Sequence, residues 1–490
     1  CRRDVRFCVE GSTEMNDAGS NSTKGSKKTR RAHGVNVSRP NILFLMTDQQ
    51  RWDALGIVDN WVKTPNLDAI AASGTLFSQC ITTSPVCVPS RLTLATGRYP
   101  HNTGVWTHQI STMPADANNW MREIRNLGYR TSLFGKTHLH PHVDDLRKKE
   151  TLLQSWGLDD VDEIGGPRNY VLSHMTAMWE EKDLLDAYRA DVKDRFANKP
   201  YVARPTTLPL EYYYDTYIGQ QAKRYLDSYS REEPWFCWVS FSGPHEPWDT
   251  PEPYASMYEP KAMPNPILDV PEQESRPKGF LDHIRNGRFS PKFENGDIGK
   301  MRANYAGNVQ LIDNQIGEIL RVIDQRGESA NTIIAFTSDH GEMNGDHGLI
   351  YKMNFFDGAL RVPLIVNVPG AEGGNVNTSL SENSDIGPTL VELAGGQLDY
   401  QQFAKSLVPA LAGGDHREDA LSEIVGEIML VNKQWKIALN DGGLTYLLFD
   451  RQNDPFETRN LAGLAKYKNT ADELRLRILE RVAQSQTILT

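Results

Sequence analysis

The chain has 490 residues, of which 39% are hydrophobic and 24% are charged, and its formal net charge is −10. This size and apolar content predict a globular protein with a sizeable core, and the negative charge argues against nucleic acid as a partner, because phosphate binding needs a basic face. Five scattered cysteines do not make a disulfide framework, and the absence of any apolar run of about 18 residues predicts no transmembrane segment.

Residues 1–39 are polar, contain a basic run at 27–31 and show no apolar stretch of the kind that a signal peptide needs. They predict a disordered N-terminal segment. Because the chain starts with Cys1, a signal that has been removed and a start at Met15 both stay open. A periplasmic or secreted location and a cytoplasmic one are therefore both compatible with the sequence.

Five apolar runs rich in β-branched and aromatic residues predict strands, and none alternates cleanly with polar residues, which is typical of strands covered on both faces. The runs are Asn41–Met46, Thr131–Phe134, Trp235–Phe241, Thr332–Phe336 and Val362–Val366. Helical patterns lie between them, at Asn66–Ala72, Ala117–Leu127 and 301–326. The alternation predicts an α/β fold, with a large, mostly parallel sheet sandwiched by helices.

The pattern changes near residue 416. Short strand-like runs at Ile424–Val431, Trp435–Leu439 and Tyr446–Phe449 predict a small antiparallel sheet, and a helix with Leu474 and Ile478 on one face follows. We therefore expect a main domain over residues 40–415 and a smaller C-terminal subdomain over residues 416–490. Residues 140–215 and 249–300 lack a clear period and are interpreted as insertions.

Polar side chains follow four of the predicted strands. In open α/β sheets, ligands bind beyond the carboxyl ends of the strands, so these side chains are candidates for one site. They are Asp48 and Gln49, then Lys136 and His138, then His245, and finally Asp339 and His340. Each of these residues alone is compatible with ordinary turn formation. Only their expected meeting at one edge of the sheet indicates a functional site.

The oxygen donors of this set, Asp48, Gln49 and Asp339, are ligands that hard divalent cations prefer. His340 is equally compatible with a metal ligand and with a hydrogen-bonding partner. The alternating His138, His140 and His142 could share one face of a strand and hold zinc, although Pro141 and the lack of a fourth ligand weigh against this.

Cys87 opens a segment that becomes helical at about Pro89 and stops at Gly97. The N-terminus of a helix attracts anions through its free N–H groups and its dipole. Arg91 lies about one turn farther along, where a guanidinium can pair with a tetrahedral oxyanion or hold a carboxylate. From these facts alone, a reactive thiolate at Cys87 and an inert buried cysteine both remain open.

The segment Cys87-Val88-Pro89-Ser90-Arg91, followed by residues 94–100 (LATGRYP), resembles the signature of the formylglycine-dependent sulfatases of the alkaline phosphatase superfamily. Further matching pieces occur in order from about residue 40 to 465. They are 41–48 (NILFLMTD), 135–138 (GKTH), Pro244-His245, 338–341 (SDHG), 345–348 (GDHG) with Lys352, 361–365 (RVPLI) and Asp454-Pro455.

The resemblance implies an alkaline phosphatase-like fold in which residues 40–415 form the catalytic sulfatase domain. It implies that a maturation enzyme oxidises Cys87 to formylglycine, and that Asp48, Gln49, Asp339 and His340 hold a divalent cation, with calcium expected. Many relatives have aspartate in place of Gln49 and asparagine in place of His340, which leaves the identity of the metal open.

By the same resemblance, a hydroxyl of the hydrated formylglycine attacks the sulfur of a small sulfated substrate. Arg91, Lys136 and Lys352 hold the charged groups, His245 or Lys352 protonates the leaving alcohol, and His138 removes a proton in the second step. A sugar, aryl or alkyl sulfate would fit, and the sequence specifies neither the leaving group nor the oligomeric state.

Two alternatives remain. Phosphonate monoester and phosphate diester hydrolases of the superfamily also use formylglycine, and some share an Asp-Gln pair like Asp48-Gln49, whereas Ser90 favours a sulfatase. The second alternative is a binding homologue in which Cys87 stays an unmodified thiol.

Overall fold

A computed structural model describes residues 39–108, 111–168, 171–268 and 289–486. We predicted disorder for residues 1–39. All of these except Arg39 lie outside the described ranges. Within the described ranges, no helix is both long enough and apolar enough to cross a bilayer, and Cys80, Cys87 and Cys237 are buried free thiols.

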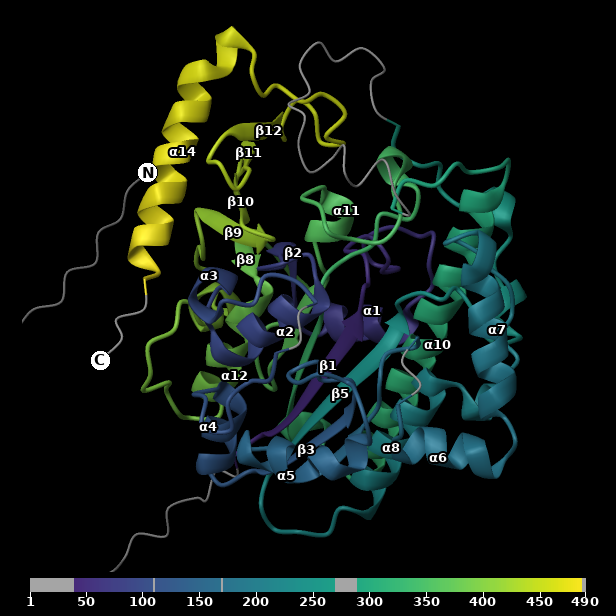
Figure 1. Ribbon diagram of the computed structural model, residues 1–490. Helices are drawn as coiled ribbons and strands as arrows, with labels where there is room; N and C mark the ends of the chain where they lie inside the picture. Colours follow the sequence, from purple (N-terminus) through teal and green to yellow (C-terminus); the bar gives the residue numbers. More distant parts are fainter. Residues whose placement is uncertain (1–38, 109–110, 169–170, 269–288, 487–490) are drawn as a thin grey trace, which may run out of the picture. The chain divides into compact units, whose positions relative to one another are not determined.

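The central feature is an eight-stranded sheet in the order β4-β3-β5-β1-β6-β7-β2-β8 (Figure 1). Of these strands only β7 runs antiparallel to its neighbours, so the predicted large, mostly parallel sheet is confirmed. The strands are β1 (Asn41–Asp48), β2 (Thr75–Ile81), β3 (Arg130–Gly135), β4 (Asp160–Glu163), β5 (Trp235–Pro244), β6 (Thr332–Ser338), β7 (Leu364–Asn367) and β8 (Asn375–Glu382).

Helices cover both faces of this sheet, as predicted (Figure 1). The helices of the described ranges, not all of which touch this sheet, are α1 (Pro65–Ala72), α2 (Cys87–Thr96), α3 (Pro100–Thr103), α4 (Trp120–Asn126), α5 (Glu150–Ser155), α6 (His174–Glu181), α7 (Leu185–Asn198), α8 (Tyr214–Ser228), α10 (Asp297–Gln325), α11 (Asp357–Leu360), α12 (Ile386–Leu393), α13 (Val408–Leu411) and α14 (Lys468–Gln484).

The two faces follow from the period of two along each strand. In β1, Leu43 and Leu45 belong to a core that includes residues of α1, α8 and α10, whereas Phe44 belongs to the opposite core with residues of α2, α4 and α12. Because both faces are buried, β1 reads as a continuous apolar run rather than an alternating one.

The C-terminal part contains a separate antiparallel sheet in the order β12-β11-β10-β9. Its strands are β9 (Asp419–Ile424), β10 (Glu427–Asn432), β11 (Trp435–Leu439) and β12 (Thr445–Asp450). Leu474 and Ile478 of α14 pack on one face of this sheet, and a second apolar cluster covers the other face. The predicted small sheet and its helix are therefore confirmed.

Several predicted boundaries were wrong. The run Ile424–Val431 is not one strand, because Val425 and Gly426 adopt positive φ and turn the chain between β9 and β10. Helix α4 begins at Trp120 rather than at 117, since the side chain of Asn119 accepts a hydrogen bond from the N–H of Arg122 and caps the helix. The predicted strand Val362–Val366 begins only at Leu364.

Other elements were not predicted at all. The segment 140–215 carries β4, α6 and α7. The strands β2 and β8, which pair with each other at one end of the sheet, also went unnoticed.

Candidate active site

The four central strands end at one edge of the sheet. Strands β3, β5, β1 and β6 are consecutive neighbours and run parallel. Strand β1 ends at Asp48, and the other three end immediately before Lys136, His245 and Asp339. The topology thus gathers the polar residues that the sequence placed after each strand.

Helix α2 supplies the remaining part of the site. Cys87 is its first residue, Val86 precedes it in extended conformation, and Gly97 ends it with a left-handed φ of 69°. The side-chain hydroxyl of Ser90 donates a hydrogen bond to the backbone oxygen of Asp339 over 2.6 Å. This contact fixes the N-terminal turn of α2 against the end of β6, with Cys87 facing the strand ends.

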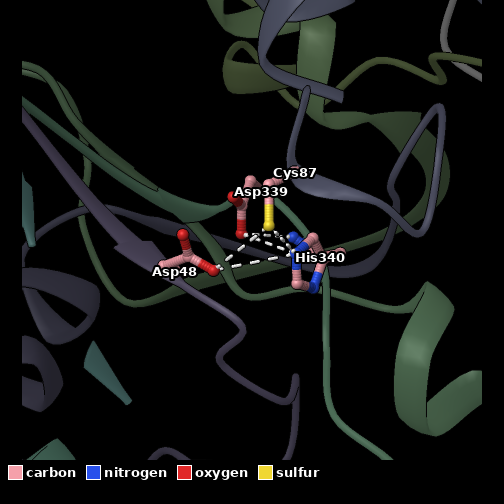
Figure 2. A group of neighbouring side chains, drawn as sticks. All are labelled: Asp48, Cys87, Asp339 and His340. Atoms are coloured by element: carbon pink, nitrogen blue, oxygen red, sulfur yellow. Dashed lines mark hydrogen bonds and ion pairs between the residues drawn. The ribbon is translucent and has the colours of Figure 1, made fainter. Parts of the chain in front are cut away.

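The thiol of Cys87 lies in a fully buried polar cluster with Asp48, Asp339 and His340 (Figure 2). Its sulfur is 3.0 Å from Nε2 of His340 and 3.7 Å from Oδ1 of Asp48. The ammonium of Lys352 lies 3.3 Å away on a distant loop. Together, these groups come from four separate parts of the chain.

Arg91 is completely buried, and its guanidinium joins the two carboxylates. Nε donates to Asp339 over 2.7 Å, and Nη2 donates to Asp48 over 3.2 Å. The ammonium of Lys136 also pairs with Asp48. Of the two roles that the sequence left open for Arg91, the structure shows the carboxylate-holding one.

The charges of this cluster shift its carboxyl groups. Burial alone would raise the pKa of Asp48, but Lys136, His245 and Arg91 lower it well below its usual value. Arg91, Lys136 and Lys352 contribute three cations beside the carboxylates of Asp48 and Asp339. These cations offset the buried carboxylates locally, in a protein that is acidic as a whole.

The ring of His340 is oriented by a backbone contact, and both roles that the sequence left open for it remain compatible with its position. Its Nδ1 lies 3.0 Å from the carbonyl oxygen of Gly341, and since a carbonyl only accepts, Nδ1 carries the proton. Nε2 then presents its lone pair 3.6 to 3.7 Å from Oδ1 of Asp339 and Oδ1 of Asp48. Such a backbone contact behind the ring is what commonly orients ligating histidines.

Gln49 has a left-handed φ of 67°, and its side chain spans several charged groups. Its amide nitrogen donates to the carboxylates of Glu246 and Glu342. Its Oε1 accepts from Lys352, which in turn contacts Cys87. The predicted ligand atom, Oε1, therefore lies beside the cluster rather than within the tightest group of carboxylates.

The predicted proton-transfer residues lie around this centre. Nδ1 of His245 donates to the backbone oxygen of Glu246 over 2.7 Å. Burial and the charge of Lys136 lower the pKa of His138 well below its usual value. Nδ1 of His138 is buried without a hydrogen-bond partner. The rings of His138 and His142 are neighbours, with centroids 4.5 Å apart, but the ligand atoms that cluster are those of His140, His142 and Glu163.

Three further residues belong to the surroundings of the site and were not singled out from the sequence. Burial and the nearby cations Lys352 and Lys136 lower the pKa of His108 to about 3. His108 lies in a loop that follows no strand, so no sequence signal points to it. Glu246 and Glu342 immediately follow segments that were singled out, and the rule of polar residues after strands could have included them.

Comparisons with known proteins identify the family to which the chain is similar. The chain matches the sulfatase family model over residues 40–396 and the N-sulphoglucosamine sulphohydrolase C-terminal model over residues 345–484. It is 29% identical to a choline-sulfatase of Rhizobium meliloti, over 87% of this chain and 83% of that protein. It is 28% identical to a multifunctional alkaline phosphatase superfamily protein of Trinickia caryophylli, over 88% of this chain and 93% of that protein.

Among solved structures, the chain is similar to the phosphonate monoester hydrolase of Agrobacterium radiobacter. The TM-score is 0.77 at 26% identity, and the match covers 91% of this chain and 96% of that one.

Proposed function

Since this chain belongs to the sulfatase family, we propose that it hydrolyses a sulfate ester at the cluster around Cys87, through a formylglycine made from Cys87 and with a divalent cation. The observation that carries this proposal is the position of the Cys87 sulfur. It lies at the start of α2, within 3.7 Å of Asp48, His340 and Lys352. A cysteine that served only packing would not require two carboxylates and three cations around it.

The residues present fit a divalent cation. Asp48 and Asp339 offer carboxylate oxygens, Gln49 offers an amide oxygen, and His340 directs an unprotonated Nε2 toward both carboxylates. Oxygen donors of this kind favour calcium, whereas the imidazole also suits softer metals, and calcium is our first choice. When bound, the cation acts as a Lewis acid that lowers the pKa of a coordinated hydroxyl and neutralises developing charge.

Formylglycine, as its hydrate, supplies two geminal hydroxyl groups in place of the thiol, and one of them serves as the nucleophile toward sulfur. The start of α2 places this group where the free N–H groups of the helix favour negative charge. A maturation enzyme that acts on the segment 87–91 is the partner this proposal requires.

The other residues orient the carboxylates and neutralise the charge of the sulfate group. Arg91 fixes Asp48 and Asp339, and Lys136 and Lys352 face the sulfate oxygens, where loss of one such contact typically costs about 2.7–4 kcal/mol of barrier. His245 or Lys352 donates a proton to the leaving alcohol. His138 is unprotonated at neutral pH, because burial and Lys136 depress its pKa, and it accepts a proton when sulfate is released.

Peptide mass spectrometry combined with kinetics tests the proposal. After co-expression with a formylglycine-generating enzyme, the peptide that contains Cys87 should be lighter than its thiol form by about 18 Da. The modified protein should release an aryl alcohol from an aryl sulfate, and Cys87→Ala should not. If the modified protein is inactive on every sulfate ester tested, including choline sulfate and sulfated mono- and oligosaccharides, the proposal fails. An unmodified Cys87 under these conditions would favour the binding-homologue alternative.

A phosphonate monoester or phosphate diester substrate is the second candidate. It is favoured by the similarity to a phosphonate monoester hydrolase and by the Asp48-Gln49 pair. Rates on a matched aryl sulfate and aryl phosphonate, measured on one preparation with the same leaving group, separate the two. We expect the larger kcat/KM on the sulfate, and the reverse order would assign the enzyme to phosphonates.

A further inference from the structure

Three buried side chains meet beside the active site and are not used in the proposed reaction. They are His140 and His142, on the loop that follows β3, and Glu163, the last residue of β4. Nε2 of His140 lies 2.7 Å from Oε2 of Glu163, and Nε2 of His142 lies 3.1 Å from Oε1. The exposed fractions of these side chains are 1%, 1% and 3%.

The strand register brings this cluster together. Strand β4 pairs in parallel with β3, and Glu163 lies opposite Gly135. Glu163 therefore emerges at the same edge as the active site, below the loop that carries Lys136 and His138. The hydroxyl of Thr137 donates to Oε1 of Glu163 and fixes the carboxylate.

The hydrogen-bond pattern leaves His140 with a lone pair facing an anion. Its Nδ1 lies 2.9 Å from the carbonyl oxygen of Pro141, which can only accept, so Nδ1 must carry a proton. In a neutral imidazole, Nε2 then has a lone pair, and it points at a carboxylate oxygen 2.7 Å away. A cation between the two atoms removes this repulsion.

His142 presents the same conflict. Its Nε2 accepts a hydrogen bond from the backbone N–H of His138 over 3.4 Å. The same atom lies 3.1 Å from Oε1 of Glu163, which already accepts from Thr137. A proton on Nε2 of His140 would remove the repulsion between His140 and Glu163 but not that between His142 and Glu163. A metal ion between all three side chains removes both.

We infer that His140, His142 and Glu163 form a second metal site, which binds zinc through Nε2 of each histidine and the carboxylate of Glu163. Two imidazoles and one carboxylate are a common zinc ligand set, and the fourth tetrahedral position is left to water. The ligand atoms all lie within 4.8 Å of one another. Bond lengths of about 2.0–2.1 Å would separate neighbouring ligand atoms by about 3.3 Å, so the His140–Glu163 pair at 2.7 Å has to open by about 0.6 Å when the ion enters.

The surroundings of the cluster match such a site. Pro141 holds the distal nitrogen of His140, and Thr137 holds the carboxylate, which are the contacts that orient ligands around zinc. The three side chains are almost completely buried, so water does not compete for the ligand atoms from outside the cluster. The metal would anchor the loop of His138 to β4 without taking part in the chemistry at Cys87.

Zinc binding to the intact protein tests this inference. The protein is first stripped of metal, then saturated with calcium to fill the cluster of Asp48 and Asp339, and titrated with zinc. We expect one equivalent of zinc to bind to the wild type and none to bind at this site in Glu163→Gln or His140→Gln. The matched control is His174→Gln, which removes a histidine that pairs with Glu150 at the surface and is 52% exposed, and which should retain the full equivalent.

Two further measurements separate this site from the cluster at Cys87. Anomalous diffraction at the zinc edge from crystals of the wild type should give a peak between His140, His142 and Glu163. Thr137→Val, which removes the contact behind the carboxylate and a weak 3.3 Å hydrogen bond from the N–H of Leu139, should lower zinc affinity about 10- to 100-fold. Failure of the wild type to take up zinc, or a peak confined to Asp48, Asp339 and His340, would overturn the inference and leave a protonated His140–Glu163 ion pair. Because the readout is metal content, it does not depend on whether sulfate esters are hydrolysed.

Discussion

The buried carboxylate of Asp215 accepts a hydrogen bond from the backbone N–H of Gly243 over 3.0 Å and a second from Ser242 over 2.9 Å. Asp215 belongs to α8, and Gly243 lies two residues before His245 at the end of β5. The amide of Asn308 in α10 donates to the other oxygen of the carboxylate. Two helices therefore hold the strand end that delivers His245 to the active site.

The burial of Asp215 predicts a pH dependence of stability. Burial raises its pKa to about 7, whereas an unfolded chain has a pKa of about 3.9. The stabilising effect of the protonated form is complete below pH about 4 and is lost as pH rises through about 7. The three-unit shift corresponds to at most about 4 kcal/mol.

Asp215→Asn should remove this dependence, because the substituted amide does not titrate and its oxygen can still accept from Gly243. Urea unfolding of both proteins between pH 4 and pH 8 measures this pH dependence of stability. The free energy of unfolding of the wild type should decline relative to that of the variant across this range. A constant difference at every pH would contradict the assignment. Asp249, whose pKa is also raised to about 6, is present in both proteins and cancels to first order.

Gly243→Ala tests the same contact from the strand side. The side chains of Asn308 and Asp215 occupy the space that a Cβ at Gly243 would need. We expect a loss of about 1–3 kcal/mol of stability from overpacking, with a fall in kcat because His245 is displaced. Thermal unfolding and steady-state kinetics measure the two effects. Gly442→Ala, in an exposed turn with ordinary space around it, is the control and should change neither.

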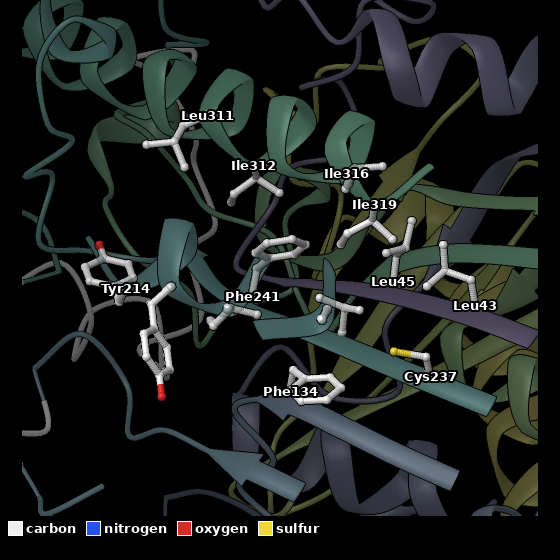
Figure 3. Packing of buried hydrophobic residues seen from close by; sticks show 14 of the residues in the cluster. Leu43, Leu45, Phe134, Tyr214, Cys237, Phe241, Leu311, Ile312, Ile316 and Ile319 are labelled. Atoms are coloured by element: carbon white, nitrogen blue, oxygen red, sulfur yellow. The ribbon is translucent and has the colours of Figure 1, made fainter. Parts of the chain in front are cut away.

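The parts of the fold that could be predicted are those in which the pattern of apolar residues is set by burial alone. Helix α10 is the clearest example: Ile312, Ile316 and Ile319 recur at helical spacing and belong to one buried core with Leu45 of β1 and Phe241 of β5 (Figure 3). The strands β1, β5 and β6 were found for the same reason, since they are buried on both faces.

The parts that were missed lack such a pattern. Strand β4 consists of Asp160, Val161, Asp162 and Glu163 at one edge of the sheet, and its partner β3 determines its conformation more than its own composition does. Strand β8, at the opposite edge, begins with the exposed Asn375 and Val376 and is buried only at its end.

The same division applies to the active site. Asp48, Lys136, His245 and Asp339 could be proposed because each follows a recognisable strand. Glu163 could not, since β4 was not predicted, and its contact with His140 and His142 depends on strand pairing that no local pattern encodes. The alternating histidines gave part of the signal, but the carboxylate that they meet lies 21 residues from His142.

Arg91→Ala should destabilise the fold as well as reduce turnover. The guanidinium is fully buried and pairs with both Asp48 and Asp339, so its removal leaves uncompensated buried charge at a cost of about 3–5 kcal/mol. Turnover of the folded fraction should fall at least about 100-fold. Denaturant unfolding beside single-turnover kinetics separates the two effects. Arg98→Ala, near the end of the same helix and with its guanidinium directed to an exposed backbone oxygen, should change stability by less than about 0.5 kcal/mol.

Removal of the proposed calcium ion should lower stability reversibly. Oδ1 of Asp48 and Oδ1 of Asp339 lie 3.7 and 3.6 Å from Nε2 of His340, where a cation would offset the repulsion that Arg91 alone leaves between the two carboxylates. Ligand binding stabilises a folded protein by about 2.7 kcal/mol at a concentration one hundred times its dissociation constant. Chelation should therefore lower the melting temperature by several degrees, and calcium should restore both it and activity toward an aryl sulfate. Asp339→Asn weakens the site, so its melting temperature should respond far less to calcium. An equal response in both proteins would show that calcium acts elsewhere on the chain.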